Sequence, residues 1–144
     1  MPATRSYMYG KLHRVTVTEA DLNYVGSITI DPLLLSAAGI YPHTLVDVVN
    51  ITNGNRIQTY VIEGESGSGC ICLNGAAAHQ FSPGDLAIIM AYEQVPIDEL
   101  AGRENVAVLV DENNHISEIL RYTTPVLEDL GQPENNRYGD KYQN

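Results

Sequence analysis

The chain carries two neighbouring stretches that set its architecture, Lys11-Leu12-His13-Arg14-Val15-Thr16-Val17 and Tyr24-Val25-Gly26-Ser27-Ile28-Thr29-Ile30. Apolar and polar residues alternate in the last four residues of the first stretch and in the last three of the second, which predicts two short strands. Gly26-Ser27 lies between them, so the Ser27 hydroxyl stands beside the carbonyl of a glycine. Such a serine can attack that carbonyl and rearrange its own backbone. The simpler interpretation of a Gly-Ser pair is a turn or a strand edge.

The rest of the chain repeats short strand patterns separated by turn residues. Asp31 followed by Pro32 predicts the start of a short helix, which Gly39 ends. Further strands are expected at 45–51, 56–62, 70–73, 86–92, 106–110 and 116–120, with a helical turn opening at 74–79. Many short strands with little helix favour a mainly-β fold, a small β-barrel with short helices. We expect one domain over residues 1–122 and a flexible, polar C-terminal tail over residues 123–144.

Charge and hydropathy exclude several classes of partner. The formal net charge of -10 over 144 residues argues against a nucleic-acid partner and against docking on anionic lipid. No stretch approaches the roughly 18 uninterrupted apolar residues of a membrane helix, and the start of the sequence shows no apolar signal segment. We therefore expect no membrane association and a cytoplasmic location.

Polar and charged side chains on two predicted strands could form a binding site for an anion. Lys11 and His13 share one face of the first strand, whereas Arg56 and Tyr60 share a face of a later strand and Thr59 takes the other face. Two cations and a phenol could converge on a small dicarboxylate. The alternative is that Arg56 and Lys11 are ordinary solvated charges at strand edges.

The segment Asn74-Gly75-Ala76-Ala77 exposes backbone N–H groups, because its side chains are small and it opens a helical turn. Such N–H groups can hold a carboxylate or a developing oxyanion. An Asn N-cap followed by a tightly packed turn explains the same residues equally well.

No metal site is expected. The four histidines do not occur in pairs at the spacing of metal ligands, and Cys70 and Cys72 lack the further ligands of a zinc site. A disulfide between such close neighbours would be strained, so we expect free thiols.

Four separated segments together resemble the family of bacterial aspartate 1-decarboxylases, pyruvoyl-dependent enzymes that make β-alanine from L-aspartate. The segments are GKLHRV at 10–15, DLNYVGS at 21–27, VNITNGNR at 49–56 and NGAAAH at 74–79. Their order and spacing match the family from about Lys11 to the strand at 106–110. The tail beyond Thr123 shows no such resemblance.

The resemblance implies a double-psi β-barrel that assembles as a homotetramer with active sites between subunits. It also implies a proenzyme that is cleaved between Gly26 and Ser27 into chains 1–26 and 27–144. Ser27 thereby becomes a covalent pyruvoyl cofactor, which forms a Schiff base with the substrate. The implied pathway is pantothenate (coenzyme A) biosynthesis. Whether cleavage is autonomous or assisted by a helper protein stays open.

The resemblance also assigns roles to individual residues. Gly26, Ser27 and Thr59 serve the cleavage, and Tyr60 matches the proton donor to the carbanion. Tyr24 and His13 match motif positions that orient groups near the cleavage site. The remaining positions match residues that bind the substrate, and these are Arg56, Lys11, Asn74, Gly75, Ala76 and Ala77.

Three other classes of function compete with this one. A pyridoxal phosphate enzyme is disfavoured, because Lys11 would be its sole ordered lysine and no phosphate-binding loop accompanies it. A non-enzymatic double-psi barrel that binds a ligand or partner would keep an intact chain. A swapped-hairpin DNA-binding β protein is disfavoured by the acidic charge balance.

Overall fold

The structure, a computed structural model, describes residues 2–24 and 26–132. In these residues the chain forms nine strands, β1 (Thr4–Thr16), β2 (Glu19–Asp21), β3 (Ser27–Ile30), β4 (Leu45–Asn50), β5 (Arg56–Glu63), β6 (Ile71–Asn74), β7 (Leu86–Pro96), β8 (Glu104–Val110) and β9 (Ile116–Thr123). It also forms one α-helix and three 3-10 helices, α1 (Pro32–Ala38), η1 (Gly75–Gln80), η2 (Ile97–Glu99) and η3 (Leu127–Asp129). The prediction of a mainly-β fold with short helices is confirmed.

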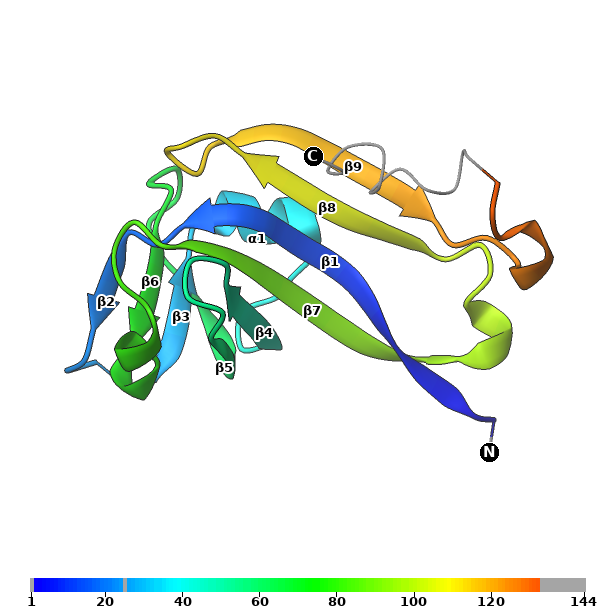
Figure 1. Ribbon diagram of the computed structural model, residues 1–144, viewed down its shortest axis with the longest axis horizontal. Coiled ribbons are helices and arrows are strands. Elements are labelled where there is room, and N and C mark those ends of the chain that lie inside the picture. The colour runs from blue at the N-terminus through cyan, green and yellow to red at the C-terminus, as the bar shows by residue number, and fades with distance from the viewer. Residues whose placement is uncertain (1, 25, 133–144) are drawn as a thin grey trace.

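The strands follow the order β2-β6-β3-β5-β4-β7-β1-β8-β9. Parallel pairing joins β1 to β8, β2 to β6 and β3 to β5, while the other neighbours are antiparallel. Figure 1 shows the long strands β1 and β7 running side by side along the molecule, with β2, β3 and β6 gathered at one end. Because β3 lies between β5 and β6, its first residue, Ser27, is flanked by segments that come much later in the sequence.

Helix α1 begins and ends where its sequence predicts. The Asp31 side chain accepts a hydrogen bond from the Leu33 N–H at 2.9 Å, and Gly39 closes the helix with φ 73°. Asp31 is buried and also accepts backbone N–H bonds from Gly67 and Gly69. Burial alone would raise the pKa of Asp31, but these backbone donors lower it. The loop before β6 is thereby tied to the helix.

The core fills the space between the sheet and α1 with aliphatic side chains. Its fully buried members come from most of the strands and include Leu12, Val15, Ile28, Ile30, Val48, Val61, Ile71, Leu73 and Ile89. The neighbours of these residues along each strand point to the other face. That alternation places the polar residues of β1, β3, β4 and β6 together on faces outside the core.

Strand β1 is longer than the sequence pattern indicates, because it begins at Thr4 and pairs with β7 along most of its length. The pairing shifts between Leu12 and Val15, where Arg14 has φ 60°. Such a bulge re-aims side chains, and bulges are frequent beside functional sites. It falls at His13 and Arg14, within the first of the family-like segments.

Strand β9 is followed in the described residues by the short helix η3. Strand β9 ends at Thr123, and the Thr124 side chain is hydrogen-bonded to the Tyr7 hydroxyl at 2.7 Å. Residues 133–144 of the expected tail lie outside the described residues.

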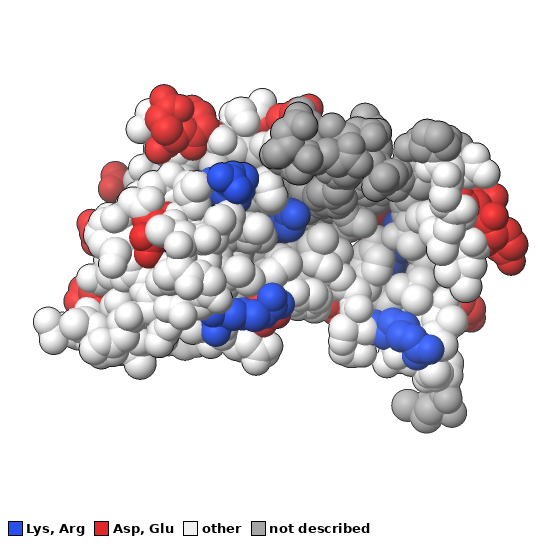
Figure 2. Space-filling view, in the orientation of Figure 1, with Lys and Arg blue, Asp and Glu red and all other residues white. Residues whose placement is uncertain are grey.

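Among the helices that the structure describes, none is long and apolar enough to cross a bilayer. Figure 2 shows the Lys and Arg side chains on the visible face in small separate groups rather than one basic patch.

Candidate active site

Ser27 lies in a square of polar side chains on the outer face of β3 and β6. In this antiparallel pair Ser27 is opposite Asn74, and Thr29 is opposite Cys72. The Asn74 Nδ2 group donates to Ser27 Oγ at 2.8 Å and to Thr29 Oγ1 at 2.9 Å. Ser27 is completely buried and Asn74 is 3% exposed. The serine hydroxyl is therefore held by an amide donor in a site with little access to water.

Gly75 packs directly on the backbone of the Gly26–Ser27 junction. It has φ 66°, and a Cβ atom there would lie 2.9 Å from Gly26 N, Gly26 Cα and the Tyr24 carbonyl oxygen. Only a residue without a side chain fits this contact. By contrast, a Cβ on Gly26 would meet nothing within 4 Å. The close approach at the junction therefore depends on Gly75 rather than on Gly26.

A cavity of about 560 Å³ opens beside the junction. The residues that line it are Gly26, Leu45, Ile57, Gln58, Thr59, Tyr60, Asn74, Ala76, Ala77 and Gln80. Strand β5 runs parallel to β3 with Ile28 level with Val61, and the same register carried two residues back brings Thr59 level with Gly26. Asn74 also does not cap η1 with its side chain, so its amide serves Ser27 and Thr29 instead.

Lys11 and Arg56 lie on one face of the sheet, with Asp47 between them. Lys11 pairs with Met90, and Met90 pairs with Asp47. The side chains of Lys11, Met90 and Asp47 therefore stand in a row across three strands that spans roughly 10 Å. Arg56 Nη2 binds Asp47 Oδ2 at 2.8 Å. A guanidinium has five N–H donors, so this ion pair leaves Arg56 able to bind a second carboxylate.

His13 lies in a setting that disfavours its charged form. Burial, followed by the charges of Lys11 and Arg14, lowers the pKa of His13 from 6.5 to about 4. Burial also lowers the pKa of Lys11. At neutral pH His13 is therefore a neutral imidazole that can both donate and accept hydrogen bonds.

We expect His13 to make the protein less stable in mild acid. Between pH 6.5 and about 4 the unfolded chain binds a proton at His13 that the folded chain does not, so falling pH favours unfolding in this window. Urea unfolding at several pH values should show a shallower loss of stability for His13→Gln than for the unchanged chain. Carboxyl groups titrate around pH 4, at the lower end of this window, and they are common to both proteins, so the difference between the two profiles reports His13. Superimposable pH profiles would contradict this expectation.

The structure brings most of the sequence-predicted residues to the junction and leaves three elsewhere. A second cavity lies on the other side of Asn74. In the part of the chain that the structure describes, Lys11, His13 and Arg56 line neither this cavity nor the one of 560 Å³. Tyr24 lines that second cavity, of about 510 Å³, and its carbonyl approaches Gly75.

Sequence reasoning did not single out Thr29, Cys72 or Asp47. Thr29 follows Ser27 by two residues, and Cys72 precedes Asn74 by two residues. Strand alternation alone could therefore have placed Thr29 on the face of Ser27 and Cys72 on the face of Asn74. Asp47 carries no comparable signal, because its contact with Arg56 depends on the pairing of β4 with β5.

The fold and the site define a small mainly-β protein built around a Gly-Ser junction whose serine is buried and whose glycine is exposed. Residues 3–117 match the family model described as aspartate decarboxylase. The chain therefore belongs to the aspartate decarboxylase family.

Individual relatives agree with this assignment. A protein of Neisseria meningitidis serogroup C named aspartate 1-decarboxylase is 56% identical over 84% of this chain and 95% of its own length. One of Listeria monocytogenes serotype 4a with the same name is 54% identical over 81% and 91%. A computationally designed protein of solved structure aligns over 60% of this chain and 99% of its own, at 15% identity and a TM-score of 0.38.

Proposed function

We propose that this protein decarboxylates L-aspartate to β-alanine and carbon dioxide, for pantothenate (coenzyme A) biosynthesis, after cleaving itself between Gly26 and Ser27. The observation that carries the proposal is the buried Ser27 hydroxyl, held by Asn74 at 2.8 Å beside a stretch of backbone against which only a glycine fits at position 75. Relatives named aspartate 1-decarboxylase at 54–56% identity supply the substrate. We place the protein in the cytoplasm.

The cleavage uses groups that lie at the junction. Ser27 Oγ bonds to the Gly26 carbonyl carbon, the amide C–N bond breaks, and the Oγ proton passes to the released nitrogen. Elimination then removes the Cα proton of residue 27 and breaks its Cβ–Oγ bond, which leaves a Cα=Cβ double bond at residue 27 and releases chain 1–26 with a carboxyl terminus. Water finally replaces the nitrogen of residue 27, ammonia leaves, and a pyruvoyl group begins chain 27–144. Thr59, which lines the cavity beside Gly26, is the residue that would stabilise the oxyanion of the first step, while Asn74 Nδ2 holds Ser27 Oγ.

Position 27 suits a pyruvoyl group. It is buried at the start of β3, faces the Asn74 donor and has the small residues Ala76 and Ala77 beside it. The chemistry such a group supplies is electron withdrawal from the carbon that loses its carboxylate. Because residue 27 has no exposed surface in the intact chain, the chain break is also what would open it to substrate.

The chain's own residues would bind and protonate the substrate. Tyr60 lines the cavity beside Gly26 and is the proposed proton donor. Arg56 and Lys11 are the proposed carboxylate-binding residues. Since they do not line this cavity, we propose that a neighbouring copy in a homotetramer brings them to it. Leu45, Tyr60 and Tyr92 expose large side chains on the same face, and this face could contact the neighbouring copy. Light scattering of the purified chain would test the homotetramer, which predicts four times the mass of one chain.

Intact-mass spectrometry of the full purified chain tests the proposed function. We expect two fragments, 1–26 and 27–144, with the larger one blocked at its amino terminus and reducible by borohydride. The same preparation should convert L-aspartate to β-alanine. A single unmodified chain after prolonged incubation, with no β-alanine formed, would contradict the proposal and favour a binding module.

Arg56→Ala should weaken the use of aspartate while leaving cleavage largely intact. Loss of a charge-assisted hydrogen bond corresponds to a fall of roughly 10- to 100-fold in kcat/KM. Arg56 lies outside the cavity at the junction, so the two fragments should still form. The matched control is Arg121→Ala, which removes an exposed arginine of β9. Full activity in Arg56→Ala would remove this residue from the site.

A further inference from the structure

We infer that Cys72 is a positioning residue for the cleavage, because its thiol orients the Asn74 amide so that Nδ2 faces Ser27. The inference rests on the proposed cleavage at Gly26–Ser27 and adds to it a residue that the family-like segments do not contain. It concerns how the donor is held rather than contact with the reacting atoms.

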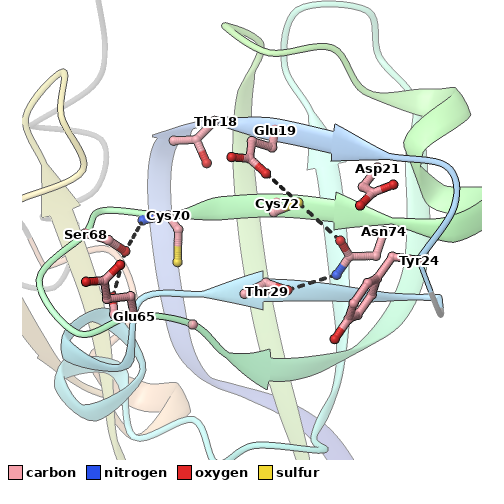
Figure 3. Close-up of a pocket in the computed structure, with 11 residues that line it drawn as sticks. Thr18, Glu19, Asp21, Tyr24, Thr29, Glu65, Ser68, Cys70, Cys72 and Asn74 are labelled. Atoms are coloured by element: carbon pink, nitrogen blue, oxygen red, sulfur yellow. Dashed lines mark hydrogen bonds between the residues drawn. The ribbon is translucent and has the colours of Figure 1, made fainter.

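The contacts form a short chain across the neighbouring strands β6 and β3. Cys72 Sγ donates to Asn74 Oδ1 at 3.1 Å, and Asn74 Nδ2 in turn donates to Ser27 Oγ and Thr29 Oγ1. Figure 3 shows Cys72 and Asn74 along β6, with Thr29 on one side and Glu19 on the other. Cys72 and Asn74 are both buried. The amide is therefore held at both of its ends.

Cys72 is the contact that decides which way the Asn74 amide faces. Ser27 and Thr29 carry hydroxyl groups, which can donate or accept and so fit either end of an amide. A protonated thiol can donate its hydrogen only to the oxygen end. Burial, followed by the nearby charges of Glu19 and Asp21, raises the pKa of Cys72 to about 11. The thiol is thus protonated at neutral pH.

Without the thiol, the neighbouring acidic residues would favour the reversed amide. Asp21 pairs with Asn74 on the adjacent strand β2, and a carboxylate there attracts the NH₂ end of the amide. Glu19 pairs with Cys72 and lies 3.9 Å from its sulfur, farther than the 3.1 Å to Asn74. The single thiol proton is therefore better placed for Asn74, and it opposes the attraction of Asp21.

The orientation matters because of how charge develops during cleavage. As Ser27 Oγ attacks the Gly26 carbonyl carbon it loses its proton, which ends on the released amide nitrogen. An N–H donor at 2.8 Å stabilises the oxygen during this transfer. A reversed amide would present its oxygen to Ser27 Oγ and would withdraw that support.

Two substitutions at Cys72 separate orientation from packing. Cys72→Val fills the space of the thiol, exceeds it by roughly one methyl group and suits a strand but has no donor, whereas Cys72→Ser keeps a donor and loses volume. We expect Cys72→Val to cleave on the order of tenfold more slowly, the effect of one lost hydrogen bond, and Cys72→Ser to cleave within about twofold of the unchanged chain. A packing role predicts the reverse order. Cys72→Ala serves as a second variant without a donor should the valine fit poorly.

The matched control is Cys70→Ala, which removes the other thiol of the same cavity. The Cys70 sulfur lies against Gly64, so cleavage should be unchanged. A double-mutant cycle adds a second readout: in an Asn74→Ala background, Cys72→Val should slow cleavage no further, because its effect passes through Asn74. Thermal unfolding checks that each variant is folded.

The outcomes distinguish this inference from the proposed function. If the unchanged chain forms no fragments, the proposed function is wrong and the inference falls with it. If the unchanged chain is cleaved and Cys72→Val is cleaved at the same rate, the positioning role alone is wrong. Equal slowing in Cys72→Val and Cys72→Ser would also overturn it, since only one of them lacks the donor.

Discussion

Ser27→Ala is expected to stay a single chain of unchanged length and to form no β-alanine. The hydroxyl is the nucleophile that cleaves the chain and its carbon skeleton becomes the pyruvoyl group, so no other residue can replace it. The expected loss of both cleavage and decarboxylation is complete within detection. Intact-mass spectrometry and a β-alanine assay on the same preparation measure the two effects together.

The fold should survive this substitution, which keeps the test specific. Removing Ser27 Oγ leaves Asn74 Nδ2 with its bond to Thr29 Oγ1 at 2.9 Å, so we expect a loss of stability of only about 1 kcal/mol. Ser36→Ala is a suitable control, because Ser36 is an exposed serine of α1 and should change neither result. Normal decarboxylation of aspartate by Ser27→Ala would show that the mechanism is wrong.

The local parts of the fold follow from sequence because neighbouring residues determine them. The Asp31 cap and the positive φ of Gly39 fix the two ends of α1, and both residues can be recognised from their side chains alone. The turn at Asn53-Gly54 likewise depends on the φ of 82° that glycine permits. Such signals need no knowledge of distant segments.

The pairing of distant strands is what the sequence leaves open. Ser27 meets Asn74 only because β3 pairs antiparallel with β6 in one particular register, and a shift by one residue would turn Asn74 to the other face. The motif residues were therefore found as separate segments, through resemblance, while their contact required the structure. For the same reason the sequence predicts no more than a free thiol at Cys72.

The length of β1 shows a second limit of sequence reasoning. Its first residues, from Thr4 onward, are mostly exposed and show little of the alternation that marks a half-buried strand. They form a strand because β7 offers backbone partners as far as Pro96. Hydrogen bonding to a neighbour, rather than burial of a face, extends the strand here.

Gly75→Ala should block cleavage and destabilise the fold. The new Cβ would lie 2.9 Å from three backbone atoms of Gly26 and Tyr24, so the Gly26–Ser27 junction or the start of η1 has to move. Alanine in the left-handed region costs about 1–2 kcal/mol, and overpacking typically adds 1–3 kcal/mol. We expect a total loss of about 2–5 kcal/mol in the free energy of unfolding, and cleavage slowed by on the order of a hundredfold or more, because small misplacements of reacting groups have effects of this size.

Gly54→Ala separates the two causes. Gly54 also has positive φ, at 82°, but a Cβ there meets nothing within 4 Å, so this variant should lose only the left-handed cost of about 1–2 kcal/mol and should be cleaved at the normal rate. Urea unfolding gives the free energies, and the appearance of fragments with time gives the rates. Cleavage of Gly75→Ala as fast as Gly54→Ala would mean that the junction tolerates displacement, and the close contact at Gly75 would then have no part in setting the geometry of attack.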